Sequence, residues 1–165
     1  MSKIFYIIPA SDPCVSNIFY MSTAATGINN KGEVVGNAAV AVSPTNTSSH
    51  GFLYSNGQTI DIGVLPGAPY SYLYPAVYPQ SINNKSQVVG SAFAQVGTTA
   101  FPYQNGQIYD LNQLISPDGP LKGSMQLVAA FINDSGVVAA NGVDSTTGAV
   151  NVYVLTPIPD ASAEQ

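Results

Sequence analysis

Short apolar segments alternate with polar corners along the chain, and one such alternation occurs three times. The copies are Gly27–Gly36, Ser81–Gly90 and Phe131–Ala140, and each places an Ile before an Asn-Asn or Asn-Asp corner. Asn and Gly accept the positive φ of a tight turn, so each copy predicts a strand, a corner and a second strand. In the first copy we expect Ile28 to be buried and Val35 to face the same core. A recurrence at roughly 50 residues indicates a repeated supersecondary unit.

A second recurring element follows each corner. It consists of two apolar and aromatic runs around Asn-Gly, and it occurs at Gly51–Gly63 and at Ala100–Asn112. Asn-Gly between such runs is the strongest short-range signal for a β-hairpin. A third copy is represented by its first strand alone, within Ala149–Leu155. We expect Ile4–Ile8 to pair with Val150–Leu155, because this would complete the third hairpin across the termini and remove an exposed sheet edge.

These patterns predict an all-β fold of about twelve strands in three four-stranded units. We expect one domain over residues 1–159, with units at about 1–45, 46–95 and 96–148, residues 149–156 closing onto the N-terminal strand, and a flexible tail at 160–165. A propeller-like or prism-like arrangement with paired terminal strands is the preferred architecture. A β-trefoil, which also has three four-stranded units, and half of a six-bladed ring completed by dimerisation are the alternatives.

The order of the two elements resembles the bacterial HAF repeat. The residues that carry the resemblance are Gly-Ile-Asn-Asn-Lys-Gly-Glu-Val-Val-Gly, then Gly-Phe-Leu-Tyr-Ser-Asn-Gly-Gln-Thr-Ile-Asp-Ile-Gly, then Ser-Ile-Asn-Asn, with His50 in the name-giving triplet. The resemblance spans about Lys3 to Leu155 and is weakest in the third unit, where Ala140 replaces the final Gly. It implies a secreted or surface-exposed bacterial repeat protein and one propeller-like blade per repeat. It supplies no catalytic residues.

Charge and composition exclude several classes of partner. The chain has no Arg, only four Lys and a net charge of −5, and charged residues make up 8% of it. A nucleic-acid partner or an anionic membrane surface requires a basic face, which this chain cannot build. No apolar run reaches the roughly 18 residues of a membrane-spanning helix, so we predict no membrane insertion. The N-terminus is interpreted as a strand rather than a signal peptide.

Residues that commonly carry catalysis are few and scattered. The chain contains a single His50 and a single Cys14, without a nucleophile elbow or a metal-spaced Cys/His set. Cys14 is interpreted as a partly buried free thiol, and His50 as a packing or hydrogen-bonding residue. Asp61 and Asp110 occupy equivalent repeat positions, which favours a turn-stabilising role over a hydrolase that uses them with His50. We therefore predict no enzyme activity, no metal and no cofactor.

Four tyrosines in the proline-rich segment Pro69–Pro79 are the most distinctive local feature. Exposed tyrosines stack on sugar rings or on partner proteins, whereas buried ones would fill the space between two units. We predict a non-catalytic binding or interaction module with a glycan or protein partner; a structural oligomerisation unit, and hence a homo-oligomer, is the alternative. The candidate ligand-binding residues are Tyr70, Tyr72, Tyr74, Tyr78 and His50.

Overall fold

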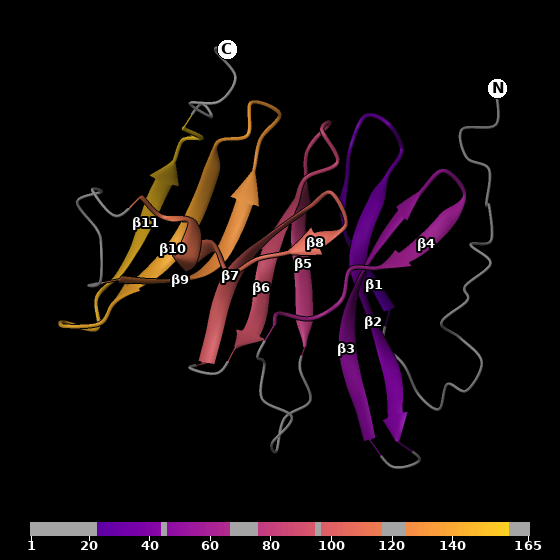
Figure 1. The fold of residues 1–165 in the computed structure, drawn as a ribbon, viewed down its shortest axis with the longest axis horizontal. Coiled ribbons are helices and arrows are strands. Elements are labelled where there is room, and N and C mark those ends of the chain that lie inside the picture. Colours follow the sequence, from indigo (N-terminus) through magenta and orange to yellow (C-terminus); the bar gives the residue numbers. More distant parts are fainter. Residues whose placement is uncertain (1–22, 44–45, 67–75, 95–96, 117–124, 159–165) are drawn as a thin grey trace, which may run out of the picture.

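The chain forms only β-strands and one short 3-10 helix in the residues that the computed structural model describes, which are 23–43, 46–66, 76–94, 97–116 and 125–158. Eleven strands make three antiparallel sheets of four, four and three strands (Figure 1), which confirms the all-β class and the three repeated sheets. These strands do not close into a barrel, so the β-trefoil alternative is not supported. No helix in this part of the chain is long and apolar enough to cross a membrane.

Each sheet follows the order of the chain. The first sheet consists of β1 (Thr23–Ile28), β2 (Val34–Ser43), β3 (Asn46–Ser55) and β4 (Gln58–Asp61). The second consists of β5 (Val77–Ile82), β6 (Val88–Ala94), β7 (Gly97–Gln104) and β8 (Gln107–Ile108), followed by the helix η1 (Leu111–Leu114). The third consists of β9 (Met125–Ile132), β10 (Val138–Asp144) and β11 (Val150–Leu155). As predicted, each corner motif joins the first two strands of a sheet, and each Asn-Gly turn joins the last two of a four-stranded sheet.

The sheets divide the chain at other places than the predicted units. They cover residues 23–61, 77–108 and 125–155, not 1–45, 46–95 and 96–148. Ser43 pairs with Asn46, so the polar stretch at the predicted first boundary lies inside one sheet. Each four-stranded sheet ends with its Asn-Gly hairpin, because the first strand of that hairpin pairs with the strand before it. The predicted pairing of Ile4–Ile8 with β11 and the tail at 160–165 involve residues outside the described ranges.

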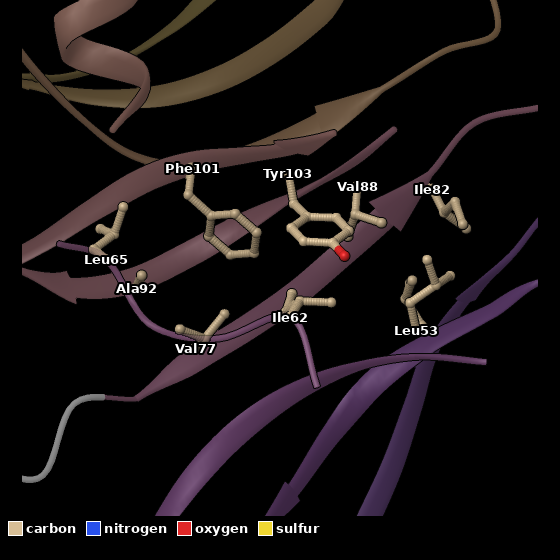
Figure 2. Packing of buried hydrophobic residues seen from close by; sticks show 10 residues of the cluster. Leu53, Ile62, Leu65, Val77, Ile82, Val88, Ala92, Phe101 and Tyr103 are labelled. Atoms are coloured by element: carbon tan, nitrogen blue, oxygen red, sulfur yellow. The ribbon is translucent and has the colours of Figure 1, made fainter. Parts of the chain in front are cut away.

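Two apolar layers hold the three sheets in a row. In the first layer, Val35 and Leu53 of the first sheet pack against Val88 and Phe101 of the second, and Ile62 from the segment after β4 fills the space between them (Figure 2). In the second layer the opposite side of the second sheet meets the third sheet; its buried members are Val89, Ala100, Leu111, Leu127, Ala130, Val138 and Ala140. The middle sheet is therefore buried on both sides, whereas the described residues cover each outer sheet on one side only.

A β-bulge in the first strand explains the glycine that ends two of the three motif copies. The bulge in β1 brings the carbonyl oxygen of Ala24 to 2.0 Å from the place of a Cβ atom on Gly36. In β5, the carbonyl oxygen of Tyr78 lies 2.1 Å from the same place on Gly90. In the third sheet the register shift lies further along β10, and Ala140 takes the equivalent position. The departure of the third copy from the repeat thus follows the position of its bulge.

The expectation that Ile28 and Val35 share one core is wrong. Ile28 pairs with Val34, and cross-strand partners lie on the same side of a sheet, while the next residue points to the other side. Val35 is fully buried against the second sheet, whereas Ile28 is 70% exposed. The corner sets this register, and no described element covers the side of the sheet that carries Ile28.

Candidate functional site

Each corner is built around one asparagine whose side chain closes the turn. Oδ1 of Asn29 accepts hydrogen bonds from the backbone N–H groups of Lys31 and Glu33, each at 3.0 Å. Asn83 and Asn133 make the same two bonds in their own corners. This is the side-chain-to-backbone chemistry by which Asn stabilises turns, and it confirms the predicted role of the motif as a hairpin corner.

The same asparagines connect each sheet to the next. Nδ2 of Asn29 donates to the carbonyl oxygen of Asn83 at 2.9 Å, and Nδ2 of Asn83 donates to the carbonyl oxygen of Asn133 at 3.1 Å. Side chain and backbone of one residue thus serve both the turn and the junction between sheets. The corner is a repeated structural joint.

A second row of bonds runs parallel to the first. The backbone N–H of Asn30 donates to Oδ1 of Asn84 at 2.8 Å, and the backbone N–H of Asn84 donates to Oδ1 of Asp134 at 2.8 Å. In both rows the donor belongs to the earlier sheet and the acceptor to the later one. The array of sheets therefore has a direction.

Glu33 is a buried carboxylate in the first corner, 9% exposed. It accepts hydrogen bonds from the corner asparagine, from the hydroxyl of Ser55 at 2.9 Å and from the hydroxyl of Ser86 in the second corner at 2.7 Å. Burial by itself raises the pKa of Glu33, but these hydrogen bonds outweigh it and lower the pKa below its ordinary value. Gln87 takes the equivalent place in the second corner, so this carboxylate is an additional fastening of the first two sheets.

His50 and Asp61 form a pair across the last two strands of the first sheet, with Nδ1 of His50 2.7 Å from Oδ2 of Asp61. The hydrogen bond to Asp61 raises the pKa of His50, against the opposing effect of partial burial. Burial acts to raise the pKa of Asp61, but the bonds from His50 and from the backbone N–H of Gly63 lower it. Both shifts favour the charged pair.

The second sheet repeats this pair without a histidine. Thr99 stands at the position of His50 and donates to Oδ1 of Asp110 at 2.8 Å. Asp110 also accepts from the backbone N–H of Asn112 at 2.9 Å, which caps η1. A threonine hydroxyl reproduces the hydrogen bond but not the acid–base chemistry of an imidazole. Both aspartates thus fasten the end of a hairpin, and their places in different sheets do not form a paired-carboxylate site.

A surface depression of about 200 Å³ lies between the segment after β4 and η1. Leu65, Pro66 and Leu114 line it together with Asp110, whose carboxylate is already bonded within the protein, and neither His50 nor Asp61 lines it. Within the described residues, no three His, Cys, Asp or Glu side chains gather as a metal site would require. The buried side-chain polar atoms of these residues all have partners. The polar groups described so far are thus hydrogen-bonded within the protein.

Tyr78 is the candidate tyrosine that the structure describes. It lies in β5, is 37% exposed and meets Phe93 edge to face, with ring centroids 6.4 Å apart and planes at 75°. His50 belongs to the first sheet, so these two candidates come from different sheets. Four residues named in the sequence analysis lie outside the described ranges: Cys14, Tyr70, Tyr72 and Tyr74.

One outer side of the row of sheets carries apolar side chains, and Ile28 among them is 70% exposed. We call it the first-sheet end face. Cross-strand pairing places Ile28 on it with the half-buried Val34, Phe52 and Tyr54, and it also places the His50–Asp61 pair on this side. The residues at the same repeat positions of the second sheet are at most 8% exposed: Ile82, Val88, Phe101 and Tyr103. The first-sheet end face therefore has the composition of a surface that is buried in the middle of the row.

The third sheet forms the opposite end of the row (Figure 1). We call its outer side the third-sheet end face. Cross-strand pairing places Phe131, Ala139, Val150, Val152 and Val154 on it, together with Asn141 and Val143 of β10. The three valines are 70–71% exposed and Phe131 is 51% exposed. The same side of the first two sheets carries Val35, Leu53 and Val89, which are buried. Protein–protein contact sites commonly have exposed apolar surface of this kind.

Sequence reasoning missed both end faces. Val150, Val152 and Val154 alternate in the way that predicts one buried side of a strand, and the pattern does not reveal that a covering sheet is absent. The available signal was the count of repeats, since every array of stacked sheets has two ends. Comparison of the chain with protein-family models, with curated proteins and with solved structures gives no match.

Proposed function

We propose that the chain is a non-catalytic protein-interaction module, a propeller-like array of three blades whose two end faces are its binding surfaces. The observation that carries this proposal is the contrast at one repeat position: Ile82 in the middle sheet is 8% exposed, and Ile28 in the first sheet is 70% exposed. A surface built to be buried and left open is a docking surface for another sheet-like surface. The HAF-like residue pattern supports the same proposal and adds a bacterial surface or secreted location to it.

A protein fits the end faces better than a glycan does. The third-sheet end face presents branched aliphatic side chains in a flat row, Val150, Val152 and Val154, as the apolar core of a protein interface does. Sugar recognition relies on aromatic platforms with convergent polar groups, and the one described candidate tyrosine, Tyr78, packs against Phe93. The proposed partner is therefore a protein.

The hydrogen-bonding roles of the polar residues support a non-catalytic function. The His50–Asp61 pair, which resembles part of a catalytic site, has a structural equivalent in Thr99–Asp110. Because a threonine makes the equivalent hydrogen bond to the aspartate in the second sheet, this bond does not depend on the acid–base chemistry of a histidine.

The test compares one face variant with one matched control. Val152→Lys places a charge on the third-sheet end face, and Leu114→Lys places the same charge on an exposed aliphatic residue outside both end faces. The wild type should either associate in sedimentation velocity or bind the apolar dye ANS. Val152→Lys should reduce whichever signal is present, and Leu114→Lys should leave it unchanged. A wild type that neither associates nor binds dye, or equal effects of the two variants, would contradict the proposal.

A further inference from the structure

The internal junctions of the array share one directional pattern. At both junctions the corner asparagine and the residue after it donate from the earlier sheet, and the later corner accepts through a backbone carbonyl and a side-chain oxygen. The apolar layer follows the same order. The side of a sheet that carries Val35 or Val89 always meets the opposite side of the next sheet.

The two ends of the array carry the two unmatched halves of this pattern. At the third corner, Nδ2 of Asn133 and the backbone N–H of Asp134 make no hydrogen bond within the described residues, although their equivalents in the first two corners donate to the next sheet. At the first corner, Oδ1 of Asn30 accepts no bond from the described residues, although its equivalent Asn84 accepts one from the sheet before it. One end therefore offers donors, and the other end offers acceptors.

The apolar surfaces at the two ends are matched in the same sense. The first-sheet end face repeats, by position, the surface with which the second sheet covers the first. The third-sheet end face repeats, by position, the surface that the first sheet presents to the second: Ala139 stands for Val35, and Val154 for Leu53. The third end of one molecule is thus built to receive the first end of another.

We propose that the partner is a second copy of this chain, joined head to tail, with the first-sheet end face of one copy on the third-sheet end face of the other. This proposal rests on the proposed function and names its partner. Head-to-tail contacts form a closed ring when the rotation closes. Two copies bring six sheets together, within the roughly four to eight blades of known propellers, and each copy then uses both of its ends.

The new junction differs from the internal ones at one place. In the first junction, Ile82 packs near Gly27, whose missing side chain allows a close approach. Phe131 takes the place of Gly27 in the third sheet, so Ile28 of the second copy would meet an aromatic ring and the junction would be wider beside β9. This contact is specific to the junction between copies and can be altered without touching the internal junctions.

The test exchanges charges across the proposed contact. Ile28→Lys and Phe131→Glu are made in separate proteins; both residues are exposed in one molecule, and circular dichroism checks that each variant folds. Each variant alone should weaken association by at least about 30-fold, the size of a hot-spot loss. Mixing the two should restore it, because one junction is then wild type and the other pairs Lys with Glu. Mixing Ile28→Lys with Phe131→Lys, which leaves a Lys–Lys junction, should give an assembly at least about 10-fold weaker than that mixture.

Each outcome of sedimentation and light scattering decides the proposal. The proposal is supported if each single variant associates weakly and mixing the two variants restores association, whether the wild type is a ring or an open chain. If one of the two variants associates as strongly as the wild type, the contact joins two identical faces and the proposal is overturned. The proposal is also overturned if both variants associate weakly and mixing them does not restore association. A wild type that stays monomeric and binds ANS at its end faces also overturns it, but leaves the proposed function standing. A monomer that binds no dye removes both.

Discussion

One repeat position offers a matched pair of truncations that measures what covers each sheet. Ile82 and Ile28 both precede an Asn-Asn corner, and each pairs with the valine that follows its corner. The first is 8% exposed and the second 70% exposed. Because strand, corner and cross-strand partner are equivalent, the two Ile→Ala variants differ mainly in the loss of contact with a neighbouring sheet.

The expected losses can be worked out from the burial. Ile→Ala removes three carbon atoms, each worth about 0.8 kcal/mol of unfolding free energy when fully buried. At Ile82 this gives about 2 kcal/mol, and the remaining cavity raises the loss to about 2–4 kcal/mol. Ile28 is 70% exposed, and its loss should be about 0.7 kcal/mol. We expect the two variants to differ by at least about 1.5 kcal/mol, or about 3–6 °C in melting temperature.

Urea unfolding followed by circular dichroism measures both losses, at a protein concentration low enough for isolated molecules. Each variant must keep the wild-type m-value, so that midpoint shifts report stability. Equal losses at low concentration would refute the reasoning, because Ile28 would then be covered in solution by its own chain. A loss at Ile28 that grows with protein concentration would instead show that another copy covers it.

Three further changes test the corners and the bulge. Asn83→Ala removes a side chain that is 1% exposed and bonds to two corners, so it should lower the free energy of unfolding in urea by about 2–4 kcal/mol. Asn133→Ala should cost less, because the third corner lacks the bond to a following sheet. Gly36→Ala places a Cβ atom 2.0 Å from the carbonyl oxygen of Ala24 and should lower stability by about 1–3 kcal/mol; an unchanged melting temperature would contradict this. Glu33 has a lowered pKa in the folded state, so it adds stability above the ordinary Glu pKa of about 4.3, and this stability is lost as the pH falls. Glu33→Gln should therefore flatten the fall of stability with acid. Parallel curves of stability against pH for the wild type and the variant would argue against this.

Features that depend on local chemistry were predictable from the sequence. The corner asparagines bond to backbone groups two and four residues away, so the motif itself contains its geometry. The Asn-Gly hairpins are local in the same way, with Asn56 and Asn105 at positive φ. The all-β class and the three repeated sheets follow from the recurrence of these local units.

Features that depend on distant partners were not predictable. The side of the first sheet that is buried depends on where the second sheet lies, and the alternation of Ile28 and Val35 around a corner does not reveal it. The grouping of strands into sheets also required tertiary pairing, since the polar stretch around Ser43 resembles a unit boundary. The meeting of His50 with Asp61 follows from the register of β3 and β4, whereas its structural role became clear only from Thr99 at the equivalent place.

Stability and direction of the array come from different interactions. The two apolar layers supply most of the free energy that holds the sheets together, but hydrophobic contact has no preferred direction. The corner hydrogen bonds are partly exposed and individually weak. Those that Asn29, Asn30, Asn83 and Asn84 donate to the next corner all point the same way, although the hydroxyl of Ser86 donates back to Glu33. Direction makes the two open ends unlike each other, and in the proposed assembly each end therefore binds the other end. An end face that recognised its own kind would leave the donors at the third corner opposite donors, which is the arrangement that the internal junctions avoid.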